Sequence, residues 1–150
     1  MLAVNTALCN GCGECERICA LTFFKTPDRA KAAIRVDKAA DGGWDVAFCN
    51  QCGECIAVCP TEALYRIKNG IVRLRGNDCV GCLACIGFCP DLVMYAVADD
   101  IVPIKCIACA KCVPACPTGA LLMLDVEAPP PVNELSRAVR AATGASPHAR

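Results

Sequence analysis

The sequence has few of the large side chains that fill a conventional hydrophobic core. Its 150 residues include only four Phe, two Tyr and one Trp. The hydrophobic share of 55% is misleading, because it counts many alanines and 16 cysteines. A chain of this length fits one ordinary domain, so we expect another component to take up part of the interior.

Sequence features of several protein classes are also missing. No uncharged apolar run approaches the ~20 residues of a membrane-spanning helix. The first residues, MLAVNTALC, show neither the basic nor the apolar region of a secretory leader. We therefore expect a cytoplasmic protein without membrane contact, in a compartment where thiols stay reduced. The formal net charge of zero gives no basic footprint for nucleic acid.

Catalytic motifs are missing as well. The chain contains neither a glycine-rich dinucleotide fingerprint nor a P-loop. His148 is the single histidine, so there is no Ser–His or Cys–His pair and no spare ligand for a pterin-bound metal. We expect no catalytic residues and no enzymatic activity of the chain on its own.

Cysteine, by contrast, is abundant and regularly spaced. All 16 cysteines fall into four groups that read C-x2-C-x2-C-x3-C. The groups are Cys9, Cys12, Cys15 and Cys19; Cys49, Cys52, Cys55 and Cys59; Cys79, Cys82, Cys85 and Cys89; and Cys106, Cys109, Cys112 and Cys116. Pro60, Pro90 and Pro117 follow the fourth cysteine of the last three groups, whereas Ala20 holds that place in the first.

This spacing suits a cubane iron–sulfur cluster. Three thiolates two residues apart can wrap one face of a [4Fe–4S] cluster from a tight loop, with backbone amides donating hydrogen bonds to the sulfurs. Glycines 11, 53 and 81 relieve crowding in three of these loops. The fourth cysteine leads away from the loop and ligates the neighbouring cluster. Four groups therefore predict four [4Fe–4S] clusters that use all 16 thiols.

Zinc and disulfides are the competing interpretations of the cysteines. Zinc sites use four ligands, often as two C-x2-C pairs separated by a longer stretch. Four identical groups of three plus one cysteine fit that pattern poorly. A disulfide scaffold is typical of small secreted proteins, a context that the start of the chain does not indicate.

The predicted clusters indicate electron transfer. Ligation by four thiolates leaves no open iron position for a substrate, so such clusters move single electrons. Two functions fit: an electron-transfer subunit of an oxidoreductase complex, or a free soluble polyferredoxin that serves several enzymes. Glu14 and Glu54 lie in the first two ligand loops and Lys111 in the fourth. On charge alone, clusters of the first two groups should be harder to reduce than that of the fourth. The alternative is that all three side chains are exposed and that solvent screens their charges.

Loop lengths leave open whether consecutive groups pair, or the first with the fourth and the second with the third. A family resemblance bears on this choice. The segments that carry it are ALCNGCGECERICAL with AAIRV, FCNQCGECIAVCPTEAL, DCVGCLACIGFCP and KCIACAKCVPACPTGALLM. Over residues 5–126, these segments resemble the four-cluster iron–sulfur subunits of the dimethyl sulfoxide reductase and formate dehydrogenase type. They are most similar to the small subunit of bacterial tungsten aldehyde oxidoreductases.

The resemblance implies nested pairing of the groups. The implied ligand sets are Cys9, Cys12, Cys15 and Cys116; Cys106, Cys109, Cys112 and Cys19; Cys49, Cys52, Cys55 and Cys89; and Cys79, Cys82, Cys85 and Cys59. It also implies a tungsten or molybdenum pterin catalytic subunit as partner, and a flavin subunit or a ferredoxin as a second partner.

The segments between the groups complete the fold prediction. Turn signals at Asp41-Gly42-Gly43, Asn69-Gly70 and Asp99-Asp100 predict three β-hairpins. The fold class is α+β, with nested two-cluster ferredoxin-like modules, short helices and hairpins over residues 1–127. Residues 128–150 are predicted as a proline-spaced arm with a short helix. Two interpretations of residues 129–145 stay open: a frayed tail, or a segment that docks on another subunit or on another copy of this chain.

Overall fold

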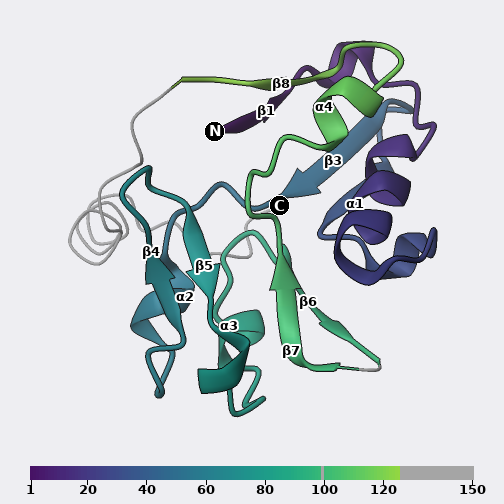
Figure 1. Ribbon diagram of the computed structural model, residues 1–150. Helices are drawn as coiled ribbons and strands as arrows, with labels where there is room; N and C mark the ends of the chain where they lie inside the picture. The colour runs from purple at the N-terminus through teal and green to yellow at the C-terminus, as the bar shows by residue number, and fades with distance from the viewer. Residues whose placement is uncertain (99, 126–150) are drawn as a thin grey trace.

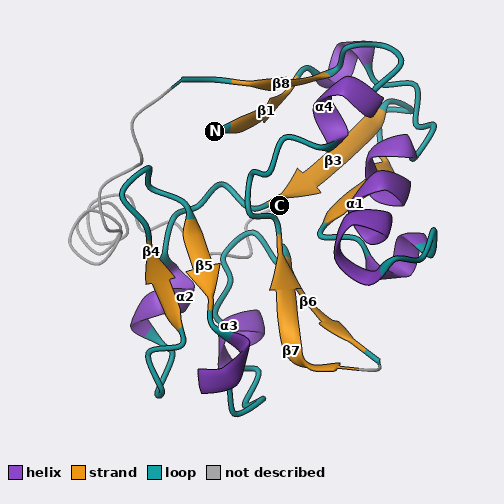
Figure 2. Cartoon of the chain, in the orientation of Figure 1, coloured by secondary structure: helices purple, strands orange, loops and turns teal. Residues whose placement is uncertain are grey.

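The computed structural model describes residues 1–98 and 100–125, so the predicted arm at 128–150 lies outside the described residues. Twelve α-helices and strands make up this part. They are β1 (Leu2–Val4), α1 (Glu14–Phe24), β2 (Ile34–Lys38), β3 (Trp44–Phe48), α2 (Glu54–Ala57), β4 (Leu64–Arg66), β5 (Val72–Leu74), α3 (Ala84–Gly87), β6 (Met94–Val97), β7 (Asp100–Lys105), α4 (Cys112–Ala115) and β8 (Leu121–Met123). Figure 2 shows this mixture of short helices and two-stranded antiparallel sheets, which agrees with the predicted α+β class.

Helix length follows the residue after each fourth cysteine. Helices α2, α3 and α4 have four residues each, and the fourth cysteine that comes after them precedes a proline. Since the residue before proline disfavours the helical region, these helices end after one turn. Ala20 imposes no such restriction, so α1 continues for 11 residues and ends at Lys25, whose φ is +58°. None of the described helices is long and apolar enough to cross a membrane.

The three predicted hairpins are confirmed as β2–β3, β4–β5 and β6–β7. The loop between β4 and β5 is longer than the two-residue turn that an Asn-Gly pair favours. Ile67 N donates to Ile71 O at 2.9 Å and Gly70 N to Ile67 O at 2.8 Å, which closes a three-residue loop. Gly70 has a φ of +82°, the left-handed position that ends this loop type. The turn between β2 and β3 has the same pattern of hydrogen bonds over residues 39–43.

Packing contacts and strand pairing divide the described elements into two groups, which we call the inner and the outer module (Figure 1). The inner module runs from Cys49 to Lys105 and contains α2, α3 and their two hairpins. The outer module comprises residues 1–48 and 106–125, where α1 packs against α4 and β1 pairs with β8. The β1–β8 sheet was not predicted, because strands of three residues leave too little sequence pattern to recognise. It joins the first described strand to the last.

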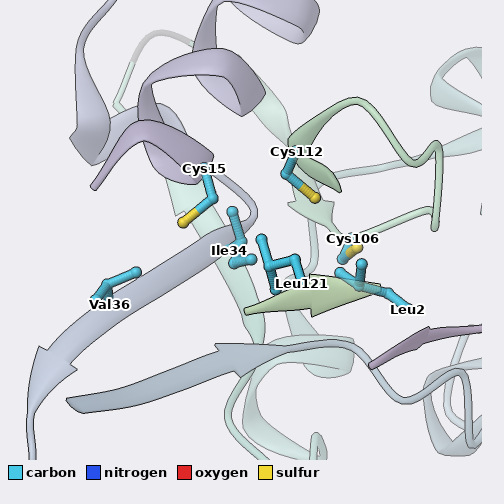
Figure 3. Packing of buried hydrophobic residues seen from close by; sticks show 7 residues of the cluster. All are labelled: Leu2, Cys15, Ile34, Val36, Cys106, Cys112 and Leu121. Carbon is cyan, nitrogen blue, oxygen red and sulfur yellow. The ribbon is translucent and has the colours of Figure 1, made fainter. Parts of the chain in front are cut away.

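Each module has its own small hydrophobic core that includes cysteine side chains. In the outer module, Ile34 and Leu121 lie among the thiols of Cys15, Cys106 and Cys112 (Figure 3). The inner core contains Leu64, Val72 and Met94 together with Cys55 and Cys85. The scarcity of large side chains is thus met by placing candidate ligands at the centre of each module.

Candidate metal centres

The four ligand loops share one backbone conformation. Each has two residues of positive φ, one before and one after its second cysteine: Gly11 and Gly13, Gln51 and Gly53, Gly81 and Leu83, Ala108 and Ala110. Alternating left-handed residues turn successive N–H groups toward the concave side of a loop, which favours bound negative charge. The third cysteine of each group then stands at the start of a helix and is buried.

Three hollows gather the cysteines into sets of four. Their cysteine linings are Cys49, Cys52, Cys55 and Cys89; Cys79, Cys82, Cys85 and Cys59; and Cys106, Cys109, Cys112 and Cys19. The space in them is nearly equal, about 320, 320 and 340 Å³, including open solvent. Each lining combines three cysteines of one group with the fourth of another, and these are three of the four sets that the resemblance implies.

The remaining cysteines, Cys9, Cys12, Cys15 and Cys116, all lie in the outer module. Cys9 and Cys116 pack against the core cluster that contains Cys15. Cys12 is exposed and lies three residues before Cys15 in the same ligand loop. Because α1 packs against α4, the first and fourth groups face each other, and the second and third do so through α2 and α3.

Backbone amides donate to several of the sulfurs, as the loop motif predicts. The donors to Sγ are Ala33 N to Cys19 (3.3 Å), Gln51 N to Cys49 (3.4 Å), Val93 N to Cys89 (3.4 Å) and Ala108 N to Cys106 (3.5 Å). Hydrogen bonds of this kind stabilise negative charge on the sulfur and are among the factors that set cluster potentials.

The two C-P-T segments add a side-chain contact to this pattern. The Thr61 hydroxyl lies 3.7 Å from Cys59 Sγ, and the Thr118 hydroxyl 3.5 Å from Cys116 Sγ. Burial raises the pKa of both thiols, but hydrogen bonds outweigh it, led by the Leu64 N–H at Cys59 and by the Thr118 hydroxyl at Cys116. The net pKa of each is lower than usual, so these two thiolates form readily.

The buried thiols behave in the opposite way. Burial raises the pKa of Cys55 and Cys112 to about 12, and that of Cys15 and Cys106 to about 11. At Cys55 the nearby charge of Lys105 acts against this rise. At neutral pH these four thiols hold their protons, and a bound metal centre would displace them.

The donor set fits an iron–sulfur cubane. Four thiolates around a hollow can each bind a different iron atom, with no need to converge on one ion. Among the described residues, no group of three or more His, Cys, Asp or Glu side chains is placed to hold a single metal ion. A tetrahedral zinc site would require such convergence, with each sulfur about 2.3 Å from the metal.

Side chains of the hairpins cover the ligand loops at their glycines. A Cβ at Gly11 would lie 2.3 Å from the Trp44 ring, and one at Gly53 would lie 2.5 Å from the Arg66 guanidinium. Trp44 therefore packs against the first ligand loop. Phe23 lines the hollow of Cys106, whereas the ring centroid of Phe24 lies 5.9 Å from Lys31 Nζ.

Two buried polar residues near the ligands were missed from the sequence. Gln51 is 1% and Lys105 5% exposed, and Lys105 Nζ donates to Gln51 Oε1 at 2.9 Å. A signal for Lys105 is present in VPIKC, because strand alternation puts it on the same face as buried Pro103. The sequence signal for Gln51 is weaker. Gln51 is the one polar residue at the position before the second cysteine, where the first and third loops have glycine.

Glu14 has a different environment from the one assumed in the charge comparison of the loops. Its carboxylate accepts from Arg17 Nη2 at 2.8 Å on the exposed face of α1. The Arg17 hydrogen bond lowers the Glu14 pKa. Pairing and solvent both reduce the field of Glu14 at the first ligand loop, so the order of cluster potentials stays a prediction.

Comparison with protein families agrees with this geometry. Two family models match, both described as 4Fe-4S dicluster domains. One matches residues 8–64 and the other matches twice, at 43–90 and 71–117, so that every cysteine group falls within a match. No curated protein matches the chain. The chain belongs to the 4Fe-4S dicluster domain family and is a ferredoxin-like iron–sulfur protein of electron transfer.

Proposed function

We propose that this chain is an electron-transfer subunit with four [4Fe–4S] clusters in nested pairs. The outer pair is held by Cys9, Cys12, Cys15 and Cys116 and by Cys106, Cys109, Cys112 and Cys19. The inner pair is held by Cys49, Cys52, Cys55 and Cys89 and by Cys79, Cys82, Cys85 and Cys59. The clusters supply one-electron chemistry when bound, while the loops, helices and hairpins fix their ligands and limit water.

The observation that carries this proposal is the composition of the hollows. In each of three hollows the fourth cysteine comes from another group. Consecutive pairing would instead require Cys19 near Cys49, and Cys116 near Cys79. The packing of α1 on α4 and of α2 on α3 also supports the nested arrangement.

The proposed partners are a tungsten or molybdenum pterin catalytic subunit, of the aldehyde oxidoreductase type, and a flavin subunit or a ferredoxin. The support for them is the family resemblance over residues 5–126 together with charge. Sixteen thiolates and four oxidised cores of about +2 each give the loaded chain about −8, since the formal chain charge is zero. A basic surface on each partner would complement this charge and speed association.

Anaerobic purification tests the function. The expected preparation is brown and contains about 16 iron and 16 sulfide per chain, with EPR signals of reduced [4Fe–4S] clusters. Zinc in place of iron would refute the cluster assignment. Purification from the native cells tests the partners: co-elution with a tungsten or molybdenum enzyme is expected. A chain that elutes alone and reduces several enzymes would instead be a free polyferredoxin.

A further inference from the structure

A buried lysine lies beside one ligand set and next in sequence to another. Lys105 ends β7 and is 5% exposed. Its ammonium group donates to Gln51 Oε1 at 2.9 Å and to the Cys106 carbonyl oxygen at 3.0 Å. Both acceptors are neutral, and the described structure places no carboxylate in an ion pair with this lysine. A charge in this position is therefore shielded from water without being cancelled by an acid.

Gln51 fixes the lysine and connects the two modules. Its Nε2 donates to the carbonyl oxygens of Cys49 at 3.2 Å and Cys106 at 2.8 Å. Its Oε1 accepts from Val72 N at 3.0 Å as well as from Lys105. Since all these groups are satisfied, the network holds Gln51 at its left-handed φ of +65°. The network bridges the second ligand loop and the fourth.

The same lysine lines the hollow formed by Cys49, Cys52, Cys55 and Cys89. Two acidic residues, Glu54 and Asp91, line it too, but Glu54 is half-buried and Asp91 exposed. Water screens charges at the surface far more than charges in the interior. Lys105 should therefore dominate the electrostatic potential in this hollow.

We propose that Lys105 is a buried cation that sets the reduction potential of the cluster held by Cys49, Cys52, Cys55 and Cys89. The inference rests on the cluster ligation proposed above. Reduction adds one negative charge to a cluster, and a fixed positive charge nearby stabilises the reduced form. Because Cys49 and Cys106 belong to different modules and Gln51 bridges them, the lysine stabilises an electron where it crosses from one cluster pair to the other.

Lys105→Met is the variant that tests this role. It removes the charge and keeps an unbranched side chain, while Gln51 Oε1 retains the Val72 N–H and the Cys106 carbonyl retains Gln51 Nε2. Lys105→Gln is a second neutral variant, and Lys105→Arg keeps the charge. Lys111→Met is the matched control, since it removes a lysine from the fourth ligand loop at an exposed position.

The measurement is an EPR-monitored redox titration with dithionite and mediators on protein with full iron content. In both neutral variants, one of the reduction steps should lose about tenfold in its equilibrium constant, or 59 mV for one electron. Lys105→Arg should titrate near wild type, and Lys111→Met should change the constants less than about threefold because solvent screens it.

Two results would overturn the proposal. One is that both neutral variants bind full iron and show the same reduction steps as the wild type. The other is loss of iron from both neutral variants, which would make Lys105 a structural support of the loop. Iron and sulfide content of the wild-type chain is measured first. A wild type that lacks four clusters contradicts the proposed function itself, before any variant is compared.

Discussion

The contact between Gly11 and Trp44 gives a sharp test of how the hairpins protect the ligand loops. Gly11 lies between Cys9 and Cys12 with a φ of +70°, and a Cβ there would meet Trp44 Cε2 and Cζ2 at 2.3 Å. Replacing Gly11 by alanine therefore does two things. It places a side chain in the left-handed region, and it pushes the indole ring away from the loop.

The size of each effect can be worked out separately. A left-handed non-glycine residue costs about 1–2 kcal/mol. Relief of the 2.3 Å contact needs a ring movement of about 1 Å, and such overpacking costs typically about 1–3 kcal/mol. Gly42→Ala is the matched control, because Gly42 has a φ of +88° but an added Cβ would meet nothing within 4 Å. Gly42→Ala should therefore show the cost of the left-handed backbone alone, without the cost of moving the ring.

Cluster loss to an iron chelator under anaerobic conditions is the assay. If the loop opens reversibly before iron is captured, the rate follows the opening free energy. The additional cost of about 1–3 kcal/mol should make Gly11→Ala lose iron about 5- to 150-fold faster than Gly42→Ala, as measured by the decay of visible absorbance. The faster phase should account for about one cluster of four.

A double variant isolates the role of the ring. In a Trp44→Ala background, alanine at position 11 meets no indole, so only the backbone strain should remain and the two substitutions should not be additive. Equal rates for Gly11→Ala and Gly42→Ala would show that Trp44 does not secure the loop. Additive effects of the Gly11 and Trp44 substitutions would refute the reasoning in the same way.

Three further outcomes are expected. Removal of iron should leave the chain largely unfolded, since cysteines occupy the centre of both cores; a cooperative thermal transition of the iron-free chain would contradict this. Cys116→Ser should impair the cluster of the first group and spare the inner pair, whereas Cys89→Ser should impair an inner cluster. Mössbauer spectra and iron content distinguish these two outcomes. Damage to the cluster of the third group by Cys116→Ser would favour consecutive pairing. Deletion of residues 128–150 should leave cluster spectra intact but weaken assembly in sedimentation; unchanged assembly would refute the docking role of the arm.

Much of the fold could be predicted because it depends on local signals. The cysteine spacing placed the four loops, and the turn residues placed the three hairpins. The β1–β8 sheet could not be predicted in this way. Leu2 pairs with Met123 across nearly the whole described chain, and such pairing leaves no periodicity in three residues. The extended α1 follows from Ala20, but its length depends on packing against α4 and β2.

In the candidate site too, features that depend on local sequence could be predicted, whereas features that depend on distant residues could not. The candidate ligands are predicted from spacing, because iron–sulfur coordination demands thiolates at fixed intervals. The environment of each ligand set does not follow, since it depends on which distant residues fold against it. Lys105 and Gln51 are 54 positions apart, yet they share a hydrogen bond at 2.9 Å. No local pattern predicts that contact, and it changes the charge that the second ligand loop experiences.

The path of the chain also explains why the two modules meet where they do. The inner module is one continuous segment, so the chain enters it at Cys49 and leaves it at Lys105. The outer module is completed only when residues 106–125 return to pack on α1 and β1. Entry and exit must therefore lie side by side, and Gln51 Nε2 bonds the carbonyls of Cys49 and Cys106 across that point. Under the nested ligation proposed above, Cys49 and Cys106 are each the first ligand of their own loop, so the covalent boundary between the modules would coincide with a short through-bond route between inner and outer ligand sets. A chain that paired its groups consecutively would cross between modules only once, with no second strand to supply the carbonyl and the lysine at that crossing.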